Sequence, residues 1–158
     1  MQPASKFLTR SFIIGFVLFS VLCINQSAKA QDISEKDVPP DVQKAFAKKY
    51  MEHSEAYWMI KDGFYIVSFK TGKEYLDACY SAKGKWIYTE RIIDFTALPK
   101  AVADSLHTSQ FGHWDVGNTY TVEVPGKSTR YRLFVYSATW DELELNFEAN
   151  GTLILDIP

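Results

Sequence analysis

The stretch VPPDVQKAFAKKY, residues 38–50, is followed by a second stretch of the same pattern, LPKAVADSLHTSQF, residues 98–111. Each begins with an apolar residue and a proline, which is tolerated in the first turn of a helix because its missing N–H needs no partner there. Apolar residues then recur every three or four positions, at Val42 and Phe46 in the first stretch and at Val102 and Leu106 in the second. We therefore predict two helices, each with one apolar stripe that must pack on another element.

Alternating strand-like runs follow each helix. The first set is FYIVSFK (64–70), KEYLDACY (73–80) and KWIYTERI (85–92), and the second set is TYTVEV, TRYRLFVY, DELELNF and TLILDI. The hairpin YLDACYSAKGKW aligns with LELNFEANGTL, which places Tyr80 over Phe147 and Gly84 over Gly151. This pattern predicts an α+β fold, a tandem repeat of one helix plus about four antiparallel strands (38–93 and 98–157), with the helices packed on one face of the sheet.

The first thirty residues have the composition of a signal peptide. Lys6 and Arg10 precede a 14-residue apolar stretch, residues 11–24, and Ala28 and Ala30 supply the small residues of a cleavage site. The apolar stretch is shorter than the roughly 20 residues that span a bilayer. Lipidation of Cys23 is the alternative, but the preceding Leu22 is too bulky for it. We expect cleavage after Ala30 and a periplasmic or secreted mature chain, residues 31–158, that forms one domain.

The composition of the mature chain limits its partners. The predicted signal peptide contains three of the 17 Lys and Arg residues and none of the 19 Asp and Glu residues, so the net charge of the mature chain is 14 − 19 = −5. Nucleic acid and anionic membranes attract clustered positive charge, so neither is expected as a partner. The mature chain has no further apolar stretch of membrane-spanning length, no partner for a disulfide with Cys79, and no motif for a cofactor. The sequence sets no oligomeric state.

The histidines near the second helix do not have the spacing of a metal or catalytic site. His107 and His113 are six positions apart, with Trp114 and Asp115 following. This spacing fits neither a helical zinc pair nor a short strand clamp, and the aligned Trp58 has no histidine beside it. Cys79 lies inside a strand-like run rather than at a nucleophile turn. We expect no catalytic, cofactor-binding or metal-binding residue.

The chain resembles the PepSY-like domains that are grouped with the beta-lactamase inhibitory protein. The resemblance covers residues 38–157 and rests on the doubled V/L-P helix start, a Trp-containing first strand and the Gly-containing hairpins. The first copy matches at Trp58, Asp62-Gly63 and residues 83–86, whereas the second has Gly117-Asn118 in place of Asp-Gly and a longer loop at residues 137–141. The resemblance implies a non-enzymatic envelope protein that binds or inhibits a protein partner.

The sheet face without helices is the predicted binding surface. Strand alternation points Leu76, Ala78 and Tyr80 toward the helices, together with Tyr131, Leu133 and Val135. The opposite face receives the aromatic, arginine and carboxylate side chains that protein interfaces favour. The predicted partner-binding residues are Tyr75, Asp77, Arg130, Arg132, Phe134 and Tyr136. Asp77 and Glu144 align between the copies, and the directions of Trp86 and Tyr88 stay open.

Three alternatives remain from the sequence. The side chains of this face could form ordinary cross-strand pairs that only stabilise the sheet. The protein could instead carry a small ligand, which requires an enclosed cavity, or it could be a hydrolase whose polar groups converge in an unrecognised site.

Overall fold

The computed structural model describes residues 30–154, so the signal peptide predicted for residues 1–30 lies outside the described residues except for Ala30. The described residues form far more strand than helix. The helices are α1 (Pro40–Lys49) and α2 (Lys100–Thr108), each preceded by a short 3-10 turn, Glu35–Asp37 and Phe95–Ala97. The strands are β1 (Gln31–Ile33), β2 (Ser54–Lys61), β3 (Phe64–Thr71), β4 (Glu74–Ser81), β5 (Trp86–Ile93), β6 (Asp115–Glu123), β7 (Arg130–Tyr136), β8 (Glu142–Glu148) and β9 (Leu153–Ile154).

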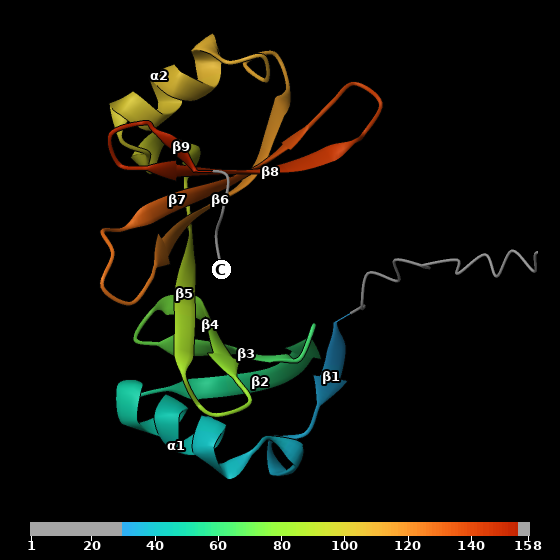
Figure 1. Ribbon diagram of the computed structural model, residues 1–158, viewed down its shortest axis with the longest axis vertical. Helices are drawn as coiled ribbons and strands as arrows, with labels where there is room; N and C mark the ends of the chain where they lie inside the picture. The colour runs from blue at the N-terminus through green and yellow to red at the C-terminus, as the bar shows by residue number, and fades with distance from the viewer. Residues whose placement is uncertain (1–29, 155–158) are drawn as a thin grey trace, which may run out of the picture.

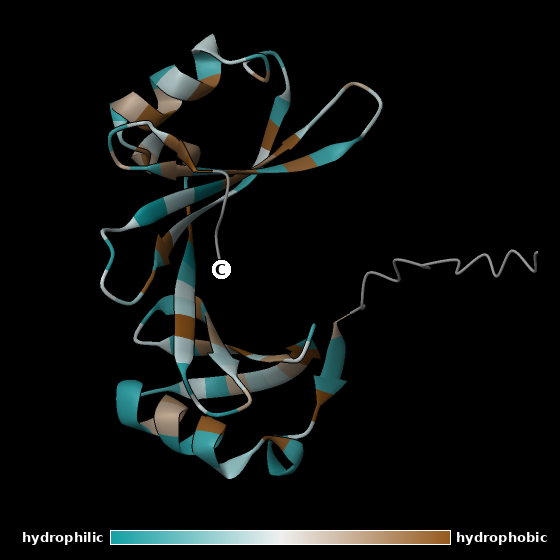
Figure 2. Cartoon of the chain, in the orientation of Figure 1, coloured by the Kyte–Doolittle hydropathy of each residue, from teal (hydrophilic) through white to brown (hydrophobic). Residues whose placement is uncertain are grey.

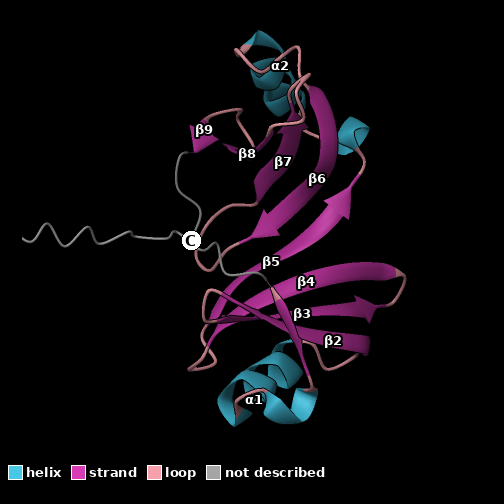
Figure 3. Cartoon of the chain, turned by 90° about the vertical axis from the view of Figure 1, so that its right-hand side faces the viewer, coloured by secondary structure: helices cyan, strands magenta, loops and turns pink. Residues whose placement is uncertain are grey.

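All nine strands form one antiparallel sheet in which each strand pairs with its neighbours in sequence. The sheet is strongly bent: β2–β4 and β7–β8 form two arms that β5 and β6 connect, and the helices lie outside the arms at opposite ends (Figures 1 and 3). The predicted α+β class with two helices and an antiparallel sheet is confirmed.

Each helix covers its own part of the sheet. Val42 and Phe46 of α1 are buried against residues of β2, β3 and β4, namely Trp58, Val67, Phe69, Ala78 and Tyr80. Val102 and Leu106 of α2 are buried against residues of β7 and β8, namely Leu133, Val135, Leu145 and Phe147. The strands alternate between hydrophobic and hydrophilic residues because only one of their faces meets a helix (Figure 2). We call this the helix face and the opposite one the open face.

Two local features differ from the sequence prediction. Strand β1 was not predicted; it is only three residues long and pairs with β2 at the edge. Gly117 and Asn118 do not form a turn like Asp62-Gly63; they lie inside β6, where the register with β7 shifts between Val116 and Thr119. A Cβ on Gly117 would lie 2.4 Å from Cε2 of Tyr136, so the glycine provides room for that ring.

A second register shift, between β4 and β5, sets the directions of Trp86 and Tyr88, which the sequence left open. Tyr80 pairs with Trp86 and Cys79 pairs with Tyr88, so one extra residue, Ile87, is accommodated in β5. Trp86 and Tyr88 therefore lie on opposite faces. Trp86 packs beside the core under α1 and donates a hydrogen bond from Nε1 to Thr89 Oγ1 at 2.9 Å, whereas Tyr88 lies on the open face with Cys79.

The β4–β5 and β8–β9 turns approach their helices in the same way. Gly84 has a φ of +72°, and a Cβ there would lie 2.4 Å from the carbonyl oxygen of Asp41, the second residue of α1. Gly151 has a φ of +86°, and a Cβ there would lie 2.4 Å from the carbonyl oxygen of Ala101, the second residue of α2. Each turn needs a glycine for its backbone conformation and for its contact with the helix.

Gly84→Ala is therefore expected to lower the free energy of unfolding by about 2 kcal/mol or more, because a strained φ and a backbone clash coincide. Gly72→Ala is the matched control: Gly72 has a φ of +60° but no atom within 4 Å of the added Cβ. Gly72→Ala should lower the free energy of unfolding only by the cost of the left-handed backbone conformation, about 1–2 kcal/mol. Urea unfolding of both variants measures the difference, and equal losses would show that the helix contact of Gly84 contributes nothing.

Candidate functional site

The open face contains all six residues predicted to bind a partner. The register places Tyr75 and Asp77 of β4 on this face, opposite Lys70 and Ser68 of β3. On β7, the open-face residues are Arg130, Arg132, Phe134 and Tyr136, because Leu133 and Val135 between them belong to the core under α2. Strand alternation thus gave the direction of each of these side chains correctly.

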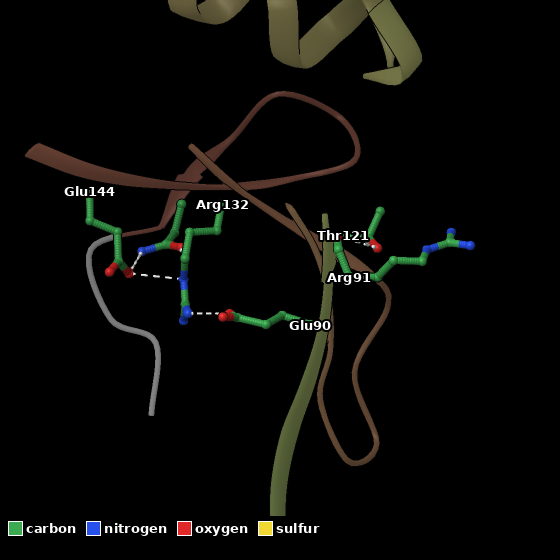
Figure 4. Close-up of polar contacts among 6 residues, drawn as sticks. Glu90, Arg91, Thr121, Arg132 and Glu144 are labelled. Carbon is green, nitrogen blue, oxygen red and sulfur yellow. Dashed lines mark hydrogen bonds and ion pairs between the residues drawn. The ribbon is translucent and has the colours of Figure 1, made fainter. Parts of the chain in front are cut away.

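An ion-pair network centred on Arg132 occupies the middle of the open face (Figure 4). The guanidinium donates from Nη1 to Glu90 Oε2 at 2.5 Å, and its Nε lies 3.1 Å from Glu144 Oε1 and 3.3 Å from Asn146 Oδ1. Asn146 in turn donates from Nδ2 to Glu144 Oε1 at 2.9 Å. Arg91 of β5 and its register partner Thr121 of β6 lie on the helix face, so the network belongs to the open face alone.

Arg132 is not the exposed side chain that the sequence predicted. It retains only 8% of its accessible surface, because its guanidinium lies over the ring of Tyr88, 5.2 Å from the ring centroid, and between two carboxylates. A buried arginine of this kind organises its neighbours more than it contacts solvent. The central residue of the predicted site is therefore covered, and its two carboxylate partners are the groups nearer to solvent.

Glu90 is the residue of this network that sequence reasoning missed. Burial raises the pKa of its carboxyl above the ordinary value; Arg132 opposes that shift, whereas Asp77 and Glu144 add to it. Glu90 pairs with Asp77 of β4 and with Val122 of β6, so it lies at the junction of the two arms. Its direction depends on the extra residue in β5, which no sequence pattern marks.

The other predicted binding residues make cross-strand contacts. The hydroxyl of Tyr75 donates to Glu55 Oε2 at 3.0 Å, and Tyr136 donates to Glu142 Oε2 at 2.6 Å. Phe134 meets the ring of Tyr120 edge to face, with the centroids 6.1 Å apart. These contacts orient the side chains and leave part of each accessible, with Tyr75 57% exposed.

Exposed hydrophobic side chains surround the centre of the open face. Of the eight large hydrophobic residues that are exposed in the described part of the chain, four point to the open face: Tyr57, Phe64, Tyr75 and Ile92. Only Tyr75 was predicted. Tyr57 and Phe64 lie on β2 and β3, which contain both surface and core aromatic residues, so residue type alone did not single these two out.

A shallow hollow of about 190 Å³ lies beside the network on the same face. It is lined mainly by apolar and aromatic residues, Phe64, Ile66, Cys79, Ile87 and Tyr88, with Lys61 and Asp62 at its edge. Burial raises the pKa of the Cys79 thiol to about 11, so the sulfur is protonated at neutral pH and is a poor nucleophile.

The histidines and Cys79 do not converge. His107 lies on α2, which covers the helix face, and its ring meets Phe95 with the centroids 6.4 Å apart. His113 is exposed in the turn before β6, and Cys79 lies on the open face of the other arm. Within residues 30–154, no three His, Cys, Asp or Glu side chains are grouped as metal ligands. No helix in that range is long and apolar enough to cross a membrane.

Comparison with known proteins identifies the family. The family model described as "Putative beta-lactamase-inhibitor-like, PepSY-like" matches residues 24–62 and 63–155, which is most of the chain. The chain belongs to this PepSY-like family. None of the curated proteins compared with the PepSY-like chain matches it.

Solved structures share the PepSY-like fold of this chain. A DUF2874 family protein from Bacteroides ovatus is 24% identical over 75% of this chain and 86% of its own, with a TM-score of 0.65. A Bacteroides eggerthii protein described as one of the "putative periplasmic proteins" is 18% identical over 74% and 86%, also with a TM-score of 0.65. A BLIP-like protein from Bacteroides fragilis is 23% identical over 72% and 81%, with a TM-score of 0.60. At these identities the similarity establishes the fold alone.

Proposed function

We propose that this PepSY-like chain is a periplasmic or secreted, non-enzymatic module that binds a protein partner on its open face and acts in an inhibitor-like way. The observation that carries the proposal is the gathering of exposed hydrophobic side chains on that face, at Tyr57, Phe64, Tyr75 and Ile92. Exposed apolar surface rimmed by polar groups is typical of interaction sites. Aromatic anchors of this kind contribute much of the binding energy when a partner excludes water from them.

The proposed contact residues remain the six that the sequence predicts: Tyr75, Asp77, Arg130, Arg132, Phe134 and Tyr136. Arg132 acts within this set by holding Glu144 and Asn146 in place, since its own surface is covered. The shallow hollow beside Cys79 would receive an apolar side chain of the partner, because its lining is mostly apolar.

The proposal includes export of the chain and an origin of its two halves by duplication. Residues 1–30 would be removed as a signal peptide, and the description of the Bacteroides eggerthii neighbour is compatible with a periplasmic location. The two halves would be copies of one helix-plus-strands unit that form a single domain, residues 31–158. The equivalent positions of Gly84 and Gly151, each against the second residue of its helix, support this duplication.

The alternatives have less support. A small-ligand carrier needs an enclosed cavity, but the hollow at Cys79 and a larger one of about 490 Å³ on the helix face are both open to solvent. A hydrolase needs convergent polar groups, but His107 and Cys79 lie on opposite faces of the sheet.

A binding experiment tests the open face directly. The purified protein is used to capture partners from envelope extract, and the affinity of the captured partner is then measured for Tyr75→Ala, Phe134→Ala and Tyr136→Ala. Each true anchor should weaken binding by more than about 1 kcal/mol, and at least one by about 2 kcal/mol. Circular dichroism verifies that every variant is folded.

Lys44→Glu is the control, because Lys44 is exposed on α1, away from the open face. It should leave the affinity unchanged. If the three open-face variants bind like the parent and Lys44→Glu abolishes binding, the partner uses the helices and the proposal is wrong.

A further inference from the structure

The two arms of the molecule are joined by little more than one pair of strands. The hydrophobic cluster under α1 and the one under α2 share no residue within the described part of the chain. The backbone connection between the arms is the β5–β6 ladder, which pairs five residues of β5 with five of β6, from Thr89↔Glu123 to Ile93↔Thr119. Of the β5 residues in this ladder, Thr89 contacts Tyr50 at the end of α1 and Ile93 packs with the cluster under α2, whereas Glu90, Arg91 and Ile92 between them belong to neither cluster. The middle of the ladder is therefore the natural hinge.

Among residues 30–154, two ion pairs cross the hinge, one on each face. On the open face, Arg132 of β7 reaches over β6 to Glu90 of β5, with 2.5 Å between Nη1 and Oε2 and with both side chains largely buried. On the helix face, Lys49 of α1 lies 3.5 Å from Glu123 of β6, and this pair is more exposed. The Arg132–Glu90 pair on the open face, which we call the inner pair, is short and shielded from solvent. The Lys49–Glu123 pair on the helix face, the outer pair, is longer and screened by solvent, so the inner pair should control the bend.

We propose that the Arg132–Glu90 pair is a latch that holds the sheet bent, and that neutralising Glu90 lets the two arms swing apart and widens the open face. The latch closes the inner side of the bend because it draws β7 toward β5 across the intervening strand. When it is released, the β5–β6 ladder and the more exposed Lys49–Glu123 pair remain between the arms. The proposal concerns the shape of the isolated chain and does not depend on the identity of a partner.

The surroundings of Glu90 make it the switching group. The charged groups that act on it come from four strands and their ends: Lys61, Asp77, Arg132 and Glu144. Cys79, Tyr88 and Tyr120 are also close, but burial raises the pKa of each of them, so they stay neutral below neutral pH. Arg130 shares the face and cannot lose its proton in this range. Two carboxylates, those of Glu90 and Glu144, thus contact one guanidinium, and Glu90 is the more buried of the two.

Acidification should open the latch without unfolding the chain. Because the pKa of Glu90 is raised in the folded state, its charged form is disfavoured there relative to the unfolded chain. Protonation as the pH falls through that pKa therefore relieves a cost of folding while it removes the charge that Arg132 binds. Glu144 keeps Arg132 partnered after Glu90 is neutralised. The arms lose the Arg132–Glu90 ion pair, stay joined through the β5–β6 ladder, and each keeps its own core.

Double electron–electron resonance between the helices measures the bend. Spin labels are placed at Lys44→Cys on α1 and Lys100→Cys on α2, both exposed, in a chain whose Cys23 and Cys79 are replaced by Ser and Ala. Because the helices lie outside the bent sheet, straightening it should bring them closer together (Figure 1). Glu90→Gln at neutral pH is expected to shift the main distance to shorter values by more than the width of the parent peak and to broaden it. The outer-pair control, Lys49→Gln, should leave the distribution unchanged.

A pH titration of the parent gives an independent readout. The distance distribution should move toward that of Glu90→Gln as the pH falls, with the midpoint of the Glu90 carboxyl resonance in NMR, while circular dichroism stays constant. Glu90→Gln itself should show no further movement in this range. If the parent distance does not change while Glu90 titrates, or if folded Glu90→Gln gives the parent distribution, the latch does not exist.

Discussion

Replacing Phe46 with alanine is expected to lower the free energy of unfolding by about 3–5 kcal/mol. Phe46 retains 3% of its accessible surface and lies at the centre of an aromatic cluster under α1. Its ring centroid is 5.3 Å from that of Trp58 and 5.0 Å from that of Phe69, both nearly edge to face. The substitution removes these contacts and leaves a cavity that large, rigid neighbours cannot fill. Denaturant unfolding measures the loss.

Two observations test the origin of this effect. Lys48→Ala, at an exposed position of the same helix, should change stability by no more than about 0.5 kcal/mol. Hydrogen exchange of Phe46→Ala should accelerate in β2–β4 more than in β7–β8, because the core under α2 contains no residue of the core under α1. Equal acceleration in both arms would show that the two cores unfold as one unit.

Arg132→Met is expected to cost about 3–5 kcal/mol at neutral pH, since it leaves the buried carboxylate of Glu90 without its partner. The loss should depend on pH. Removing the guanidinium takes away the group that lowers the pKa of Glu90, so Glu90 becomes protonated at a still higher pH. Neutral Glu90 needs no counter-ion, so the stability lost at neutral pH should be partly regained as the pH falls. Chemical unfolding at about pH 7.5 and about pH 5 compares the two conditions.

The double variant Glu90→Gln/Arg132→Met separates charge from packing. It should recover most of the stability lost in Arg132→Met at neutral pH, because no buried charge remains unpaired. Arg130→Met is the matched control on the same strand and face, where Arg130 lies opposite Glu148 in the strand register, and it should lower the free energy of unfolding by less than about 1 kcal/mol. A loss for Arg132→Met that is the same at both pH values would contradict this explanation.

The sequence alone located both helices and most of the strands, and it assigned the face of most strand residues. Proline near each helix start and apolar residues at helical spacing located α1 and α2, because these signals are local to the chain. Alternation assigned Leu76, Ala78 and Tyr80 to the helix face and Tyr75 and Asp77 to the open face. The alignment of Gly84 with Gly151 also has its counterpart in the structure, since both glycines approach the second residue of a helix.

The tertiary structure decided the register shifts and the burial of side chains, which strand alternation does not predict. One extra residue in β5 places Trp86 and Tyr88 on opposite faces and turns Glu90 toward Arg132. In β6, Gly117-Asn118 lies inside the strand at a register shift, unlike Asp62-Gly63, which forms a turn. The burial of Arg132 depends on Tyr88, Glu90 and Glu144, which lie 44, 42 and 12 positions away in the sequence (132 − 88, 132 − 90 and 144 − 132). Strand periodicity tells which face a side chain points to; whether that side chain is covered depends on the strands beside it and on the bend of the sheet, which are set only when the distant segments pair.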